Sequence, residues 1–330
     1  MTEAGDGHRP TVVFIGGSGR SGSTLLERML GAVPGVGALG EVVHLPARGL
    51  VERETCACGR ALDLCEFWSE VGERAFGGWD RVDGAEWRAL QARVDRTRHL
   101  PLLAVPVRRS FRADLGEHTG RLERLYRAAA EVAGASVLID SSKNTSTAFT
   151  LRHLSLPVRY VHLVRDSRGV AYSWTKEVER PETARGHLMP RYSPAATAAW
   201  WDAFNVIMGL LPATGTDVIR VRYEDLVTDP QAVLRAVLGP TGLPIDPGWD
   251  RFLTPAGAEL GPGHSVAGNP MRFTSGVIPL HRDDAWRSRL PSRDRRIVTA
   301  LTAPFLARYG YLGRRDPDRG TVAVIVAITL

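Results

Sequence analysis

The sequence predicts an α/β protein with a mostly parallel sheet covered by helices on both faces. Short apolar runs that can each form a strand alternate with longer segments of helical spacing. The runs are apolar throughout rather than at every second residue, which is typical of strands buried on both faces of a parallel sheet. Polar and glycine-rich residues follow several runs, at the carboxyl ends of strands where ligands bind in such folds.

The first strand and helix flank a glycine-rich turn. The apolar run 12–15 leads into GGSGRSGST and then into the amphipathic run 25–30. Glycines let successive backbone N–H groups point at one anion, and the helix N-terminus adds partial positive charge. Arg20 supplies a cation within the turn, and Ser21, Ser23 and Thr24 supply hydroxyl donors. The segment is therefore predicted to bind a phosphate group.

The spacing of this turn matches the nucleotide-triphosphate loop GxxxxGK[ST] from Gly17 to Thr24, with one departure. Ser23 stands where that loop has its lysine, and the cation has moved to Arg20. Because the lysine is the cation that reaches the terminal phosphates, its absence favours a reaction related to phosphoryl transfer over phosphoryl transfer itself.

The other elements follow in order along the chain. A short strand is expected at 36–39, with Glu41 just past its end, and residues 48–135 are interpreted as a helical insertion. Residues 255–290 are glycine-, proline- and arginine-rich and are expected to be largely irregular. Further strands are predicted at 137–140, 159–165 and 217–223. Helices are predicted at 85–97, 119–133, 168–177, 195–211 and 292–309, with one more between the strand at 137–140 and about residue 154 and another that begins at 224.

Composition indicates a globular protein of 330 residues, with 44% apolar and 24% charged residues. The net charge of +6 comes almost wholly from arginine, with lysine only at Lys143 and Lys176, so no nucleic-acid partner is implied. The first ten residues lack the apolar core of a signal peptide, and no run approaches the ~20 apolar residues that span a bilayer. The apolar closing run 321–330 is interpreted as a strand or ordered tail, and a cytoplasmic location is expected.

A second motif is VRDSRGVAYSW at 164–174. Arg165 closes a predicted strand, and Ser173 lies eight residues later, about two helical turns into the next element. Taken alone, the segment is equally an ordinary helix start capped by Asp166 or Ser167. Its position downstream of the glycine-rich turn favours a ligand-binding role.

Together these motifs resemble sulfotransferases that use 3′-phosphoadenosine 5′-phosphosulfate (PAPS). GRSGST at 19–24 is similar to their 5′-phosphosulfate loop, and 164–174 is similar to their 3′-phosphate motif. The loop arginine and the pair Gly40–Glu41 resemble the bacterial branch that shares its pattern with protein-tyrosine sulfotransferases. The resemblance implies the P-loop nucleotide-kinase-like fold, in one domain over 1–330 whose insertion at about 48–135 faces the acceptor.

The resemblance also implies residue roles. Arg20 would hold the leaving 5′-phosphate, Lys143 would stabilise the transferring sulfonate, Glu41 would act as the base, and Arg165 and Ser173 would grip the 3′-phosphate. Tyr223 would lie near the nucleotide, although it and the following Glu224 and Asp225 have an equally good structural explanation as a helix start. The implied PAPS-binding set is Gly19, Arg20, Ser21, Gly22, Ser23, Thr24, Arg165, Ser173, Tyr223 and, from a C-terminal closing loop, Ser265, Asn269 and Arg272.

The expected chemistry is in-line transfer of a sulfonate to a hydroxyl, in which positioning and neutralisation of the leaving phosphate matter most. The transferred group carries little charge, so no metal is expected. Glu41 suits the base if partial burial raises its pKa toward neutrality; the alternative is a solvated or arginine-paired carboxylate. His44, His162 and His264 are alternative bases, of which His162 fits a core residue better.

Three cysteines lie close together in CACGRALDLC: Cys56, Cys58 and Cys65. They could bind zinc with a fourth ligand such as His44, or form a disulfide, but the spacing is not a standard zinc pattern. Free, partly buried thiols in a structural turn are the favoured interpretation, and their role stays open.

The predicted function is PAPS-dependent sulfation of a hydroxyl on a carbohydrate, glycolipid or secondary metabolite, with release of adenosine 3′,5′-bisphosphate. The alternatives are an ATP-dependent small-molecule kinase and a non-catalytic nucleotide-binding protein. The sequence identifies neither the acceptor nor the oligomeric state.

Overall fold

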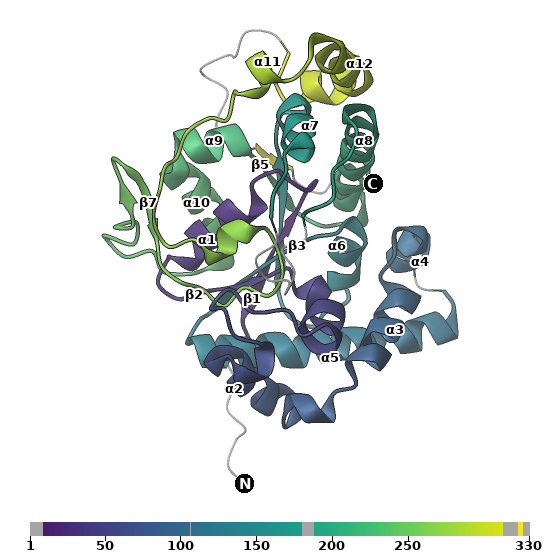
Figure 1. Cartoon of the computed structure of the whole chain (residues 1–330). Helices are drawn as coiled ribbons and strands as arrows, with labels where there is room; N and C mark the ends of the chain where they lie inside the picture. Colours follow the sequence, from purple (N-terminus) through teal and green to yellow (C-terminus); the bar gives the residue numbers. More distant parts are fainter. Residues whose placement is uncertain (1–8, 106, 180–187, 313–322, 326–330) are drawn as a thin grey trace.

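The computed structural model describes residues 9–105, 107–179, 188–312 and 323–325 (Figure 1). Its centre is a sheet of six strands in the order β2-β3-β1-β4-β5-β9. The first five strands are parallel and β9 joins the edge antiparallel to β5. The strands are β1 (Thr11–Gly16), β2 (Val36–Gly40), β3 (Val137–Lys143), β4 (Val158–Val164), β5 (Val218–Arg222) and β9 (Ala323–Ile325).

Helices cover both faces of this sheet, as the sequence predicted. Alternate residues of β1 enter two different apolar clusters, with Val12 and Phe14 in one and Val13 and Ile15 in the other. The cluster with Val13 contains α1 (Ser23–Gly31), α9 (Tyr223–Thr228) and α10 (Pro230–Leu238). The cluster with Val12 contains α2 (Glu66–Phe76), α3 (Gly84–Val94), α5 (Arg109–Ala133) and α6 (Thr145–Leu151). The parallel three-layer fold is thus confirmed.

A third group of helices packs together near β5 (Figure 1). It consists of α7 (Ser167–Thr175), α8 (Pro194–Leu210) and α12 (Ser292–Arg308). Val170 of α7, Trp201 of α8 and Tyr309 just after α12 share an apolar cluster with Val164 at the end of β4. These helices therefore fix the element that follows β4. The short α4 (Leu100–Ala104) and α11 (Trp286–Arg289) complete the α-helices of the described residues.

The insertion differs in detail from the prediction. The helix expected at 119–133 already begins at Arg109, and α2 was not predicted. Trp68, Val71 and Ala75 of α2 are buried with Trp87 of α3 in the same cluster as Phe14 of the sheet. The insertion therefore shares an apolar core with the central strands.

Two corrections concern the C-terminal half. The helix expected from 224 onward is two helices, because Pro230 cannot continue α9; Asp229 caps α10 by accepting the N–H of Ala232 at 3.1 Å. The segment 255–290 contains two short strands, β7 (Gly257–Leu260) and β8 (Gly276–Ile278), which form a small antiparallel sheet with β6 (Leu253–Thr254) just before it. Val266 of this segment also pairs with Gly40, which brings it against the main sheet.

The apolar closing run forms β9 at 323–325, and the rest of that predicted strand lies outside the described residues. Among the described helices, none is both long and apolar enough to cross a membrane.

Candidate active site

The glycine-rich turn connects β1 to α1 through contacts that demand glycine at two positions. A Cβ at Gly17 would lie 2.3 Å from the carbonyl oxygen of Leu163, and a Cβ at Gly22 would lie 2.5 Å from the ring of Tyr223. Gly22 is also the N-cap of α1, with a left-handed φ of 95°. The turn is therefore pressed against β4 and the start of α9, with its backbone N–H groups at the N-terminus of a buried helix.

Arg20 lies inside this turn in a left-handed conformation, φ 68°. Its guanidinium stands 5.0 Å from the ring centre of Trp174, and its Nη2 is 3.2 Å from the sulfur of Met189. Burial, reinforced by the nearby charge of Arg165, lowers the pKa of Arg20. Nε of Arg20 and Oγ of Ser21 are buried and lack a hydrogen-bond partner within the described parts of the chain. Two unsatisfied donors in one turn fit an anionic oxygen ligand.

Arg165 follows β4 and is 7% exposed. It donates to the backbone oxygen of Arg20 at 3.1 Å and to Asp283 Oδ2 at 3.0 Å, and it lies 4.4 Å above the ring centre of Tyr223. A Cβ at Gly169 would lie 3.4 Å from Arg165 Nε. Because Ser173 is one helical turn beyond Gly169, it shares the α7 face that meets Arg165. The structure thus places Arg165 next to the turn, and helical periodicity puts Ser173 on the face of α7 that meets it.

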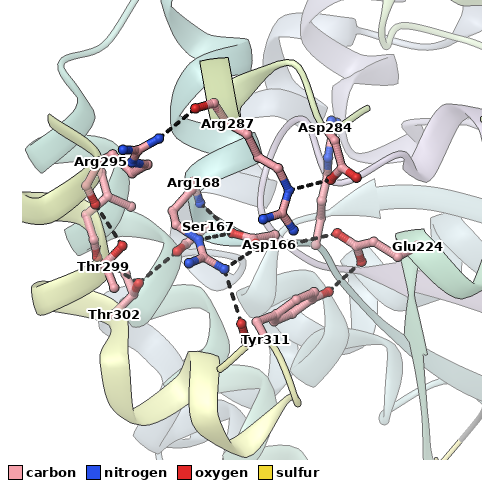
Figure 2. Close-up of polar contacts among 12 residues, drawn as sticks. Asp166, Ser167, Arg168, Glu224, Asp284, Arg287, Arg295, Thr299, Thr302 and Tyr311 are labelled. Carbon is pink, nitrogen blue, oxygen red and sulfur yellow. Dashed lines mark hydrogen bonds and ion pairs between the residues drawn. The ribbon is translucent and has the colours of Figure 1, made fainter. Parts of the chain in front are cut away.

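A polar network fixes the start of α7 (Figure 2). Asp166 caps the helix by accepting the N–H of Arg168 at 2.9 Å, and its own N–H donates to Glu224 at 3.1 Å. The hydroxyl of Tyr311 donates to the other oxygen of Glu224 at 2.7 Å, and Ser167 hydrogen-bonds Thr302 at 2.7 Å. Glu224 therefore holds α7 in place, a structural role other than the helix start that the sequence offered for it, although it does lie in the first turn of α9.

Glu41 comes directly after β2 and is 7% exposed. Its Oε1 is paired with Nζ of Lys143, at the end of neighbouring β3, and its Oε2 lies 3.3 Å from Nε2 of His44. Its backbone N–H donates to Val266 at 2.8 Å, and a Cβ at Gly268 would lie 3.3 Å from Oε1. Two of the predicted catalytic residues, Glu41 and Lys143, therefore form an ion pair beside the segment 266–268.

The sequence made Glu41 suitable as a base on the condition that burial raises its pKa toward neutrality, and this structure does not meet that condition. Burial does raise the pKa, but the adjacent Lys143 ammonium and the contact with His44 outweigh that effect and lower it to about 2. The sequence argument counted burial and left out the cation, because nothing along the chain indicates that residues 41 and 143 touch. In this arrangement the carboxylate is ionised at neutral pH and is a weak base until the lysine moves away.

Several residues that position this pair were not predicted. Asp140 is fully buried in β3. Its carboxylate accepts hydrogen bonds from the hydroxyl of Tyr126 at 2.6 Å and from the backbone N–H of Ser142 at 2.8 Å. Ser142 in turn accepts the N–H of Val43 at 2.9 Å, just after Glu41. The polar run after the apolar part of β3 was the available signal, but its partners come from other elements.

Glu27 in α1 was also missed. It is 2% exposed, and it accepts the hydroxyls of Ser141 at 2.7 Å and Ser265 at 2.5 Å; burial raises its pKa. On the same helix, Arg28 donates to the backbone of Met271 at 2.9 Å and of Gly261 at 3.0 Å. The predicted cofactor residue Ser265 is thus an anchor that attaches the closing segment to α1.

The other two predicted residues of the closing segment make local contacts. Asn269 caps a short turn by accepting the N–H of Met271 at 3.0 Å. Arg272 is 2% exposed, donates to the backbone of Thr55 at 3.1 Å and lines a cavity with Arg28 and His264. The structure thus groups Arg272 with the cysteine segment, whereas Arg165 is grouped with the glycine-rich turn.

The alternative bases fall in three different environments. His162 is buried in β4 and 2.9 Å from Asn205, and burial lowers its pKa to about 3, which confirms the prediction of a core residue. His44 contacts Glu41. His264 lies beside the three cysteines, which are free thiols.

A glycine-rich turn between the central strand and a buried helix, in a parallel sheet of this order, defines an α/β protein with a P-loop-like fold. A family model described as the sulfotransferase family matches residues 10–247. The chain therefore belongs to the sulfotransferase family, which makes it a transferase. A search of curated protein sequences returns no significant match.

Solved structures provide further similar chains. The sulfotransferase domain from the Synechococcus PCC 7002 olefin synthase is 24% identical, with 91% of this chain and 96% of that chain covered and a TM-score of 0.46. The sulfotransferase domain from the curacin biosynthetic pathway is 19% identical, with 89% and 98% covered and a TM-score of 0.47.

Proposed function

We propose that this sulfotransferase uses PAPS as its sulfonate donor and acts on a hydroxyl acceptor. The observation that carries the proposal is the order of side chains along neighbouring strand ends. Glu41 follows β2, Lys143 ends β3, Arg20 follows β1 and Arg165 follows β4, and these four strands are adjacent in that order. Three strand spacings separate the first from the last, about 14 Å. In this order Glu41 would act as the base, and Lys143, Arg20 and Arg165 would contact the sulfonate, the 5′-phosphate and the 3′-phosphate of the donor.

The turn and Arg165 fit the two anionic ends of such a donor. Nε of Arg20 and Oγ of Ser21 are unsatisfied donors within the described residues, and Ser23 and Thr24 begin α1. When bound, the donor supplies an activated sulfonate with a phosphate leaving group. Arg20 and the backbone amides of the turn would hold that phosphate, at ~1.5–3 kcal/mol for each charge-assisted hydrogen bond.

The cations beside the turn are neutralised by carboxylates in this structure. Asp283 pairs with Arg165, and Glu41 pairs with Lys143. An anionic donor would compete for both cations. Once Lys143 turns to the sulfonate, the pKa of Glu41 rises because its strongest cationic neighbour has left. Glu41 can then accept the proton of the acceptor hydroxyl, while Lys143 stabilises the transferring group.

The acceptor would approach from the Glu41 side, which the insertion flanks. Gln91 of α3 donates to the backbone oxygen of Val43 at 2.9 Å, two residues from Glu41. We propose that residues 1–330 form one domain in which this insertion shapes the acceptor site. A hydroxyl on a carbohydrate, glycolipid or secondary metabolite is the proposed substrate class.

The test is a melting-temperature titration with adenosine 3′,5′-bisphosphate and, separately, with magnesium-ATP. We expect stabilisation by the bisphosphate that exceeds that by magnesium-ATP, because a ligand that binds only the folded state raises its stability. A larger shift with magnesium-ATP would contradict the proposal and favour a kinase. No shift with either would favour a chain that has lost the nucleotide site.

A further inference from the structure

The three cysteines and one histidine converge although they come from distant parts of the chain. Cys56 and Cys58 lie in a turn after residue 51, Cys65 is the N-cap of α2, and His264 lies about 200 residues later. One ligand atom from each lies within 4.8 Å of every other. Cys56 and Cys65 are fully buried.

The separations are close to those between the corners of a tetrahedron around one ion. Metal–sulfur bonds of about 2.3 Å and metal–nitrogen bonds of about 2.0–2.1 Å place ligand atoms roughly 3.4–3.8 Å apart. The sulfurs of Cys56 and Cys65 are 3.7 Å apart, and Nδ1 of His264 is 3.2 Å from Cys65 and 3.9 Å from Cys56. The thiols are free, so the cluster is not a disulfide in this structure.

The surroundings hold the ligands in this orientation. The ring of His264 stacks on Phe67 with centres 5.2 Å apart, and its backbone oxygen accepts the indole N–H of Trp68 at 2.5 Å. Cys65 caps α2, where the helix N-terminus favours a thiolate. A tight turn closed by Gly59 donating to Cys56 at 2.8 Å sets the first two sulfurs. Such support is what orients metal ligands in proteins.

We propose that Cys56, Cys58, Cys65 and His264 bind one zinc ion in a closed, four-coordinate structural site. Three thiolates and an imidazole are ligands that zinc takes in structural sites, and four protein ligands leave no open position for a substrate. His264 takes the fourth place that the sequence analysis offered to His44. The expectation that the chain carries no metal is revised by this proposal.

The ion would attach the closing segment to the rest of the fold. Next to His264, Ser265 accepts the N–H of Ala57 at 3.1 Å, and Val266 exchanges hydrogen bonds with Leu39 and Glu41, each at 2.8 Å. Zinc would therefore join residues 56–65 to the segment that walls Glu41. This role is independent of the donor nucleotide and of catalysis.

The first measurement is the metal content of the full chain, purified under reducing conditions without chelators. We expect one zinc per chain in the wild type and in His281→Asn, an exposed histidine of the same segment. We expect less than half an equivalent in His264→Asn and in Cys58→Ser, whose thiol is only half-buried and so is the cysteine least needed for packing. Cobalt added to demetallated wild type should give the visible absorption of tetrahedral, thiolate-ligated cobalt, and His264→Asn should change it.

Three results would overturn the proposal. One is wild-type protein that carries no zinc and takes up neither zinc nor cobalt at one equivalent per chain. Another is full zinc content and an unchanged cobalt spectrum in His264→Asn. The third is a disulfide among the three cysteines, detected by mass spectrometry of the reduced preparation. The first and third of these results are measured on the wild-type protein, so the proposal can be overturned even if a variant fails to fold.

Discussion

The two halves of the candidate site are built in different ways. The donor half, defined here as the turn 17–24 with Arg165 and Ser173, is carried by strand ends of the parallel sheet and by the first turns of the helices that follow. The closing half, defined as residues 41–68 with 261–273, joins segments about 200 residues apart through hydrogen bonds to Glu27, Glu41 and His264. The donor half is a local motif, whereas the closing half exists only after folding.

The halves also differ in charge. In the donor half, like charges lie together: burial and the charge of Arg165 lower the pKa of Arg20, and two buried donors of the turn lack partners within the described residues. The closing half is instead attached to a satisfied group, the buried carboxylate of Glu27 in α1, which accepts the hydroxyls of Ser141 and Ser265. Buried polar or charged groups without partners lower the stability of the ligand-free protein, and such groups point to ligand binding. Buried groups whose hydrogen bonds are made within the protein point to a structural role.

The largest expected effect is on catalysis at the junction of the halves. Glu41→Gln keeps the size of the side chain and removes the base, so kcat for sulfonate transfer should fall by about 10²- to 10⁴-fold. The affinity for adenosine 3′,5′-bisphosphate should stay within a few-fold of wild type. Once an acceptor is found, steady-state kinetics decide this, and an unchanged kcat would rule out Glu41 as the base.

The next effect tests whether the donor half is built for a ligand at a cost in stability. Arg20→Gln should weaken bisphosphate binding by about 10- to 100-fold, the worth of one or two charge-assisted hydrogen bonds. The melting temperature of the free protein should not fall, because the variant removes a buried charge that faces Arg165. Calorimetry and a melting curve measure both. A large loss of stability with unchanged binding would assign Arg20 to the structure instead.

A third prediction concerns pH. Glu41 has a pKa of about 2 in the folded state, lower than the ordinary value, so its pairing stabilises the fold above about pH 4.3 and that contribution is lost as the pH falls toward 2. In Lys143→Met, burial acts without the ammonium and the pKa should rise above the ordinary value. The acid limb of kcat/KM should then move to higher pH than in wild type. An unmoved limb would mean that Lys143 does not control the charge of Glu41.

The smallest effect tests the closing half. Ser265→Ala removes a hydroxyl from buried Glu27 and should lower stability by about 1–3 kcal/mol, measured by denaturant unfolding. Bisphosphate affinity should change by no more than about threefold, because Ser265 is an anchor here. Ser288→Ala, at an exposed serine, serves as the control. A tenfold loss of affinity at unchanged stability would restore Ser265 as a donor contact.

The sequence could predict the donor half because its signals are local. The turn, its helix and Arg165 with Ser173 are each encoded within about ten residues, and the continuous apolar runs specify the parallel sheet. The ion pair of Glu41 with Lys143 and the convergence of His264 on the cysteines depend on strand order and on a loop that returns across the sheet. No spacing along the chain reports those contacts, so the sequence could predict neither the pKa of Glu41 nor the place of His264 beside the cysteines.

The central claim is that separate strand ends hold the two phosphates of one donor. It is tested most directly by calorimetric affinities of adenosine 3′,5′-bisphosphate and adenosine 5′-phosphate for wild type and Arg165→Ala. We predict that wild type prefers the bisphosphate by about 10- to 100-fold. In Arg165→Ala this preference should fall close to one, while the affinity for the monophosphate changes little. An equal preference in both proteins would contradict the claim that Arg165 holds the 3′-phosphate.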